Sequence, residues 1–119
     1  MYKTLTGDWR FRQADQGDWM PAKVPGCNFL DLMAAGKLPD PFVGMNEKEV
    51  GWVGHADWVY EKQFTVTAEE LQADAVYLRC DMLDTICDVV LNGHRVLQGK
   101  NCFVRYRVPV KERLQVGEN

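Results

Sequence analysis

Apolar and polar residues alternate along most of the second half of the chain. Trp58, Tyr60, Phe64 and Val66 fall on one face of a predicted long strand, and polar residues fall on the other. Similar alternation marks residues 76–80, 87–91 and 103–110. A period of two residues is typical of half-buried strands, because successive side chains point to opposite faces. The pattern therefore predicts a series of antiparallel strands.

The turns between these segments predict how the strands are connected. Residues 9–12 alternate bulky apolar with charged side chains, residues 15–18 form a polar loop, and residues 19–24 are expected to return along the first strand. Asn92-Gly93 lies between two apolar segments. This dipeptide is the strongest short hairpin signal, because a type I′ turn requires positive φ at both central residues.

One short helix is predicted after the first hairpin. Asn28 is expected to cap it, and Gly36 is expected to end it in a left-handed conformation. Its apolar face is formed by Phe29, Leu32 and Met33. Further on, Thr67 followed by Glu70 resembles a capping box, which predicts a single helical turn over residues 68–72.

These elements predict the fold class. Roughly six to eight strands without strand–helix–strand alternation indicate an all-β, antiparallel jelly-roll β-sandwich with one short helix. Residues 114–119 are expected to lead into a Gly-Glu-Asn turn. Because a sandwich needs further strands to close its exposed edges, we expect residues 1–119 to form one domain that is truncated at its C-terminal end.

Composition narrows the functional classes. The 119 residues are 46% hydrophobic and carry a net charge of −3, which argues against a nucleic-acid partner. Residues 1–12 lack the apolar core of a signal peptide, and no apolar run reaches the roughly 20 residues of a membrane helix. The four cysteines form no CxxC pair, which favours free thiols over a disulfide or metal site and predicts a cytoplasmic location.

Few residues point to catalysis, but one loop suits carbohydrate binding. His55 and His94 are the only histidines, and neither belongs to a catalytic motif. Residues 38–56 combine Asp40, Asn46 and Trp52 with several glycines and prolines. Aromatic rings stack on sugar faces, and Asp and Asn bind hydroxyl groups. The alternative is that Trp52 pins the loop to its own core.

Beside these features, a series of short motifs extends along the whole chain and resembles the N-terminal domain of β-mannosidases in glycoside hydrolase family 2. The motifs are Leu5-x-Gly7-x-Trp9-x-Phe11, Val24-Pro25-Gly26, Asp31-Leu32, Asp40-Pro41-Phe42-x-Gly44-x-Asn46-Glu47, Trp52-Val53, Asp57-Trp58-x-Tyr60-x-x-x-Phe64, Leu83-Asp84-Thr85, Leu91-Asn92-Gly93 and Asn101-x-Phe103. The motif from Asp40 to Glu47, followed by Trp52-Val53, points to mannosidases rather than to other members of that family.

The resemblance implies a galactose-binding-like jelly roll that packs against a (β/α)₈ barrel. The barrel supplies the two glutamates of a retaining mechanism, so no catalytic residue is expected here. A later Trp-Asp-Trp-Gly-Pro stretch of the family is absent from the sequence. By similarity, Asp40, Asn46 and Trp52 would help wall the sugar pocket. Asn101 is a weaker substrate-binding candidate, and the alternative is a buried Asn that satisfies loop backbone groups.

The sequence thus predicts part of a retaining exo-β-mannosidase that acts on terminal β-linked mannose. Its partners would be a β-mannoside and the barrel domain, with no cofactor, metal, nucleic acid or membrane. The chain alone is expected to be inactive. Two alternatives remain: a free-standing carbohydrate-binding module, and a fragment of a β-galactosidase, β-glucuronidase or exo-glucosaminidase.

Overall fold

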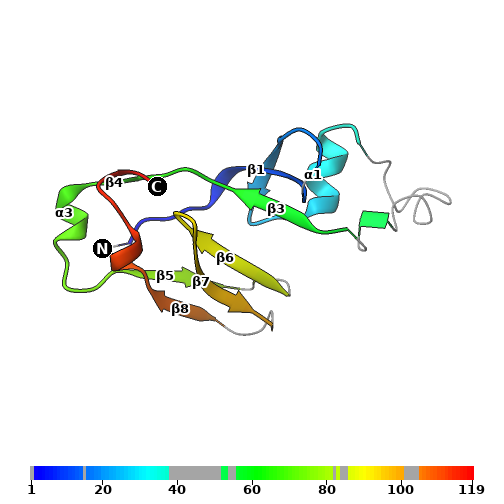
Figure 1. Cartoon of the computed structure of the whole chain (residues 1–119). Coiled ribbons are helices and arrows are strands. Elements are labelled where there is room, and N and C mark those ends of the chain that lie inside the picture. The colour runs from blue at the N-terminus through cyan, green and yellow to red at the C-terminus, as the bar shows by residue number, and fades with distance from the viewer. Residues whose placement is uncertain are drawn as a thin grey trace. The chain divides into compact units, whose positions relative to one another are not determined.

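The structure is a computed structural model that describes residues 2–14, 16–37, 52–53, 56–81, 83, 86–100 and 105–119. The chain divides into two compact units, Met1–Lys62 and Gln63–Asn119. Each unit is described by itself, and Figure 1 shows the elements of both.

The first unit is built on a three-stranded antiparallel sheet. Strand β1 (Gly7–Gln13) lies between β2 (Met20–Val24) and β3 (Trp58–Glu61). Phe11 is paired with Met20 on one side and with Tyr60 on the other, so these three side chains share one face of the sheet. The buried core on that face consists of Phe11, Ala22, Leu32 and Val53. The predicted first hairpin is therefore confirmed.

Helix α1 (Asn28–Ala34) packs against this sheet. The expectation that Asn28 caps it was wrong. Cys27 occupies the cap position, no side chain there forms a capping hydrogen bond, and Asn28 is the first helical residue. Gly36 has a φ of 73°, as predicted for the residue that ends the helix.

The second unit contains shorter antiparallel pairs. Its elements are β4 (Thr65–Val66), α3 (Ala68–Leu71), β5 (Tyr77–Cys80), β6 (Cys87–Leu91), β7 (His94–Gly99), β8 (Tyr106–Pro109), the 3₁₀ helix η2 (Lys111–Arg113) and β9 (Gly117–Glu118). Among the residues described, β4 pairs with β9, β5 with β8 and β6 with β7.

Local signals in this unit are largely confirmed. Thr67 and Glu70 form both hydrogen bonds of a capping box, so α3 is the predicted helical turn. Asn92 and Gly93 have φ values of 50° and 83° and connect β6 to β7. The antiparallel, mostly β fold class is confirmed, with two short α-helices in the described ranges.

Two details of the prediction were wrong. The single long strand expected across residues 58–66 is interrupted, since β3 ends at Glu61 and β4 begins at Thr65. Residues 117–118 form β9 rather than a turn, because they pair with β4. Asn119 extends this pairing: its N–H donates to the Phe64 carbonyl at 2.8 Å, and its carbonyl accepts from the Phe64 N–H at 3.0 Å.

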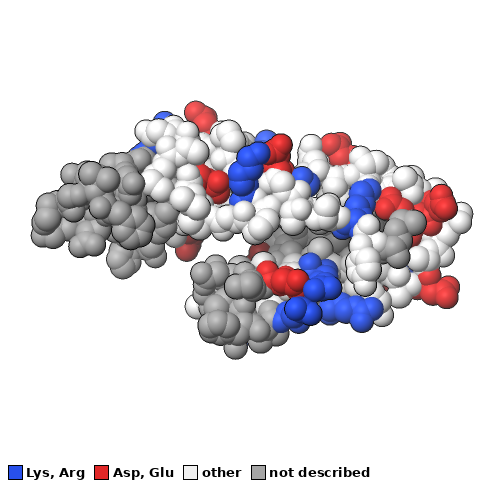
Figure 2. Space-filling model, turned by 180° about the vertical axis from the view of Figure 1, so that it is seen from behind, with Lys and Arg blue, Asp and Glu red and all other residues white. Residues whose placement is uncertain are grey.

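Charges of both signs are mixed at the surface. Figure 2 shows Lys and Arg side chains interspersed with Asp and Glu on one face. Asp81, for example, pairs with Arg79 at 3.1 Å and with Arg105 at 3.3 Å. No helix within the described ranges is long and apolar enough to cross a membrane.

Candidate functional site

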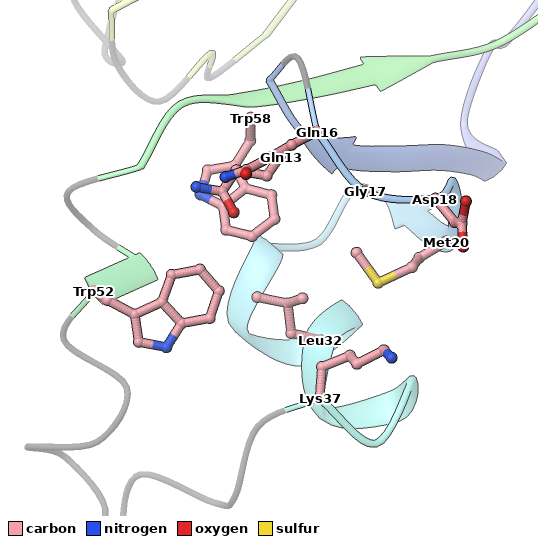
Figure 3. Close-up of a pocket in the computed structure, with 9 residues that line it drawn as sticks. All are labelled: Gln13, Gln16, Gly17, Asp18, Met20, Leu32, Lys37, Trp52 and Trp58. Atoms are coloured by element: carbon pink, nitrogen blue, oxygen red, sulfur yellow. The ribbon is translucent and has the colours of Figure 1, made fainter.

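A pocket of about 500 Å³ opens in the first unit, between the end of the β1–β2 hairpin and helix α1. Figure 3 shows the residues that line it. They are Gln13, Gln16, Gly17, Asp18, Met20, Leu32, Lys37, Trp52 and Trp58. Its volume lies within the range of about 300–1,000 Å³ that is typical of small-molecule sites.

Two tryptophans form one wall of this pocket. The rings of Trp52 and Trp58 lie 5.8 Å apart, centre to centre, at an angle of 40°. The Trp58 indole Nε1–H donates to the Val53 carbonyl at 3.0 Å, which ties Trp58 to the segment that carries Trp52. Val53 is 1% exposed, whereas Trp52 is 44% exposed. Val53 therefore anchors this segment in the core, and the ring of Trp52 remains accessible.

Four polar side chains lie around the pocket. Gln13 ends β1, Gln16 and Asp18 lie in the hairpin loop, and Lys37 follows α1. The backbone holds this loop in place, since Ala14 N–H donates to the Asp57 carbonyl at 2.8 Å. None of the hydrogen bonds and ion pairs of the described residues uses these four side chains, so their polar groups are available to a ligand.

Behind the pocket, Asp31 joins α1 to the sheet. This carboxylate is 6% exposed, and its Oδ1 accepts the backbone N–H of Lys23 in β2 at 3.1 Å. Its Oδ2 is buried and has no hydrogen-bond partner of ordinary geometry among the described residues. Burial, together with the neighbouring negative charge of Asp31, raises the pKa of Tyr60 above its ordinary value.

None of the thiols in the described ranges lines the pocket. Cys27 is exposed, Cys80 and Cys87 are half-buried, and all three are free. Burial, with a smaller effect of Cys87, raises the pKa of the Cys80 thiol, which lowers its reactivity. Within the described ranges, no three His, Cys, Asp or Glu side chains are grouped as a metal site requires.

Only one of the predicted site residues can be placed. Trp52 lines the pocket, and its contact with substrate stays a prediction. Asp40, Asn46 and Asn101 lie outside the described residues. Sequence reasoning missed Gln13, Gln16, Asp18 and Lys37. The sequence did contain a signal for Gln13. In the alternating pattern of this strand, Gln13 continues the series Trp9 and Phe11 and places a polar side chain where the earlier members are aromatic.

Comparison with known proteins gives the context of this site. Residues 9–119 match the family model described as "Glycosyl hydrolase 2 galactose-binding domain-like". β-Mannosidase B of Thermothelomyces thermophilus is 42% identical over 118 residues, covering 97% of this chain and 14% of the fungal protein. β-Mannosidase B of Aspergillus terreus is 36% identical over 116 residues, covering 94% and 14%.

Solved structures agree on the fold. The crystal structure of the β-D-mannosidase from Dictyoglomus thermophilum superimposes with a TM-score of 0.94 at 44% identity, covering 97% of this chain and 14% of that chain. The exo-chitosanase CsxA of Amycolatopsis orientalis, with a TM-score of 0.82 at 19% identity, shares the fold alone. The chain belongs to the glycosyl hydrolase 2 galactose-binding domain-like family.

Proposed function

We propose that this chain is the N-terminal domain of a retaining exo-β-mannosidase that removes terminal β-linked mannose. The observation that carries the proposal is the 44% identity and TM-score of 0.94 with a β-D-mannosidase across 97% of the chain. Relatives that are named β-mannosidases match over 97% and 94% of the chain.

The domain's own contribution would be scaffold and part of the sugar pocket wall. The chain spans 14% of the length of the curated relatives described above. In the proposed enzyme, the nucleophile and the acid/base are glutamates of a barrel domain. The exposed ring of Trp52 supports a wall function, because an accessible indole offers an apolar face to a sugar ring.

The test combines the coding sequence beyond Asn119 with an activity assay. If the reading frame continues into a barrel, the longer polypeptide should hydrolyse an aryl β-mannoside with retention of configuration, and the 119-residue chain should show no turnover. The corresponding aryl β-galactoside and aryl β-glucuronide are the comparison substrates for the aryl β-mannoside. Faster hydrolysis of either one, or turnover by the chain alone, would refute the proposal.

A free-standing carbohydrate-binding module is the second candidate. It is favoured by the combination of an exposed Trp52 with polar pocket side chains that have no partner among the described residues. A stop codon directly after Asn119, together with sugar binding by the chain, would favour this candidate over the enzyme domain.

A further inference from the structure

We propose that the outer face of the β2-β1-β3 sheet binds an acidic peptide segment, whose Glu or Asp carboxylate pairs with Arg12. The outer face is the side of the sheet turned away from the buried core that contains Phe11. Arg10 and Arg12 alternate with Phe11 along β1, so their side chains lie on this outer face. Neither arginine lines the pocket, and the proposal does not depend on the enzyme assignment.

The three strands carry five charged residues, and four of them neutralise one another. Arg10 forms an ion pair with Glu61 of β3. Lys23 of β2 forms an ion pair with Asp8 of β1. In both pairs the two residues lie directly opposite each other on neighbouring strands, which brings their side chains together on one face. Arg12 is therefore left as the charge on these strands that no other strand residue balances.

The half-buried guanidinium of Arg12 lacks a polar partner. Its Nε is buried and has no hydrogen bond, and no ion pair of the described residues uses this side chain. Buried polar groups are almost always hydrogen-bonded, and a charged group without a partner is unfavourable. A carboxylate supplies both the acceptor and the missing negative charge, and it matches the planar guanidinium with two parallel hydrogen bonds.

Apolar surface flanks Arg12 on both sides. The Trp19 ring centre lies 4.6 Å from the guanidinium carbon of Arg12 and 4.2 Å from that of Arg10, so cation–π contacts hold both groups in place. On the other side of β1, Val59 of β3 is paired with Arg12 and is 39% exposed. An ion pair is stronger beside such apolar surface, because the local dielectric constant is lower than in water.

These flanks favour a peptide over a free anion as the ligand. A small anion would contact the Arg12 guanidinium and leave Val59 and the Trp19 ring in water. The residues that precede and follow a Glu or Asp in a peptide can cover both apolar side chains while the carboxylate reaches Arg12. Burial of this additional apolar surface adds to the binding free energy.

Side-chain NMR of the ¹⁵N-labelled 119-residue chain tests the proposal, because the Arg12 Nε–Hε group gives its own signal. The probes are acetyl-Val-Glu-Val-amide, its neutral counterpart acetyl-Val-Gln-Val-amide, and sodium acetate. The Glu peptide should shift the Arg12 signal with a Kd of about 1–10 mM, and the other two probes should bind at least about tenfold more weakly. No shift with the Glu peptide, or equal affinity for either of the other probes, would overturn the proposal.

Variants locate the site, with the backbone amide shifts of residues 10–12 and 59–61 as the readout. Arg12→Lys keeps the charge but loses the planar fork, so it should bind the Glu peptide about fivefold more weakly. Arg12→Met removes the charge and should weaken binding at least about tenfold. Arg95→Gln in β7, where Arg95 lies 3.8 Å from Asp88, is the matched control and should bind normally. Unchanged affinity of Arg12→Met would refute the site.

Stability separates binding by Arg12 from a structural function. Because Arg12 is a half-buried cation without a counter-charge among the described residues, Arg12→Met should leave the midpoint of urea unfolding unchanged or raise it. Methionine also keeps an unbranched apolar stem beside Trp19. A clear fall in the midpoint would show that Arg12 serves the fold, and it would overturn the inference.

A second copy of the chain is the competing occupant, because the chain itself carries a net charge of −3. Sedimentation velocity at the concentration of the NMR sample should therefore show a monomer. A dimer that Arg12→Met dissociates would assign the outer face to a second copy and would overturn the acidic peptide as its ligand.

Discussion

At the scale of single residues, Asp31 links the helix to the sheet. Its Oδ1 accepts the Lys23 N–H of β2, and its buried position places its charge beside Tyr60 of β3. A buried carboxylate is unfavourable unless it is hydrogen-bonded, so this contact has a direct effect on stability. Leu32, the next residue in the chain, lines the pocket, so the helix that Asp31 fixes to the sheet also contributes to the candidate site.

Asp31→Ala should lower the free energy of unfolding by about 1–3 kcal/mol, because it leaves the Lys23 N–H without its partner. Urea unfolding followed by circular dichroism measures the change. Asp74→Ala, at an exposed position, is the control and should change stability by less than about 0.5 kcal/mol. Equal midpoints for the two variants would show that Asp31 does not stabilise the unit.

Tyr60 should make the chain sensitive to alkali. The pKa of Tyr60 is raised in the folded state, so the folded chain holds the phenol proton more tightly than the unfolded chain does. The contribution of the neutral phenol to the free energy of unfolding is therefore fully present below the ordinary pKa of 10.0 and decreases as pH rises above it. In Tyr60→Phe, the fall in unfolding free energy between about pH 9 and 11 should be shallower, by at most about 1.4 kcal/mol per pH unit.

The comparison is made by urea unfolding at several alkaline pH values. Tyr2→Phe changes a side chain that is 94% exposed and serves as the control. A slope for Tyr60→Phe that matches the slope of this control would contradict the interpretation of Tyr60.

At the scale of elements, the sequence predicted turns and caps better than it predicted strand lengths. The Asn92-Gly93 turn and the Thr67 capping box were both found, because each depends on residues within four positions of one another. The break between Glu61 and Thr65 was missed. Alternation continues across it, and the end of a strand depends on which partner strand is present.

The Asn92-Gly93 turn makes a prediction at this scale. Asn92 combines a φ of 50° with side-chain hydrogen bonds from its Nδ2 to the Arg113 carbonyl at 2.7 Å and to Asn119 Oδ1 at 2.8 Å. Asn92→Ala should lower the unfolding free energy by about 2–3 kcal/mol, since it loses the bonds and strains the turn.

Asn92→Gly keeps the backbone freedom and loses only the side-chain bonds, so its loss should be about 1 kcal/mol. Thermal or urea unfolding of both variants separates the two effects. If the two variants have equal unfolding free energies, the left-handed backbone conformation of Asn92 does not affect the stability of the turn.

At the scale of the whole molecule, the candidate site was only partly predictable. The sequence singled out Trp52 as an aromatic residue in a long loop, and Trp52 lines the pocket. The hairpin residues 13–18 and Lys37 were missed, because their proximity to Trp52 is created by packing of segments that are distant in sequence. The family resemblance, by contrast, was readable from motif order alone and is confirmed by the match over residues 9–119.

Stability of the first unit depends on a small core. Phe11 is fully buried; its ring stacks on Tyr60 at 5.3 Å and packs in a tilted arrangement against Trp58 at 5.8 Å. Phe11→Ala should cost about 3–5 kcal/mol, a large fraction of the roughly 5–15 kcal/mol that stabilises a typical domain. Near-ultraviolet circular dichroism should therefore report loss of packing. Ile86→Ala, at a side chain that is 84% exposed, should be neutral, and equal behaviour of the two variants would contradict this assignment.

The Trp52–Trp58 pair also has an optical consequence. Two identical chromophores that are close together and inclined to each other, here at 5.8 Å and 40°, couple their electronic transitions. Such coupling produces paired dichroic bands of opposite sign, which should disappear in both Trp52→Phe and Trp58→Phe. The aromatic wall therefore carries its own spectroscopic signature, and its assembly can be followed without a ligand or a label. Spectra in which only one of the two substitutions removes the bands would contradict the observed ring pairing.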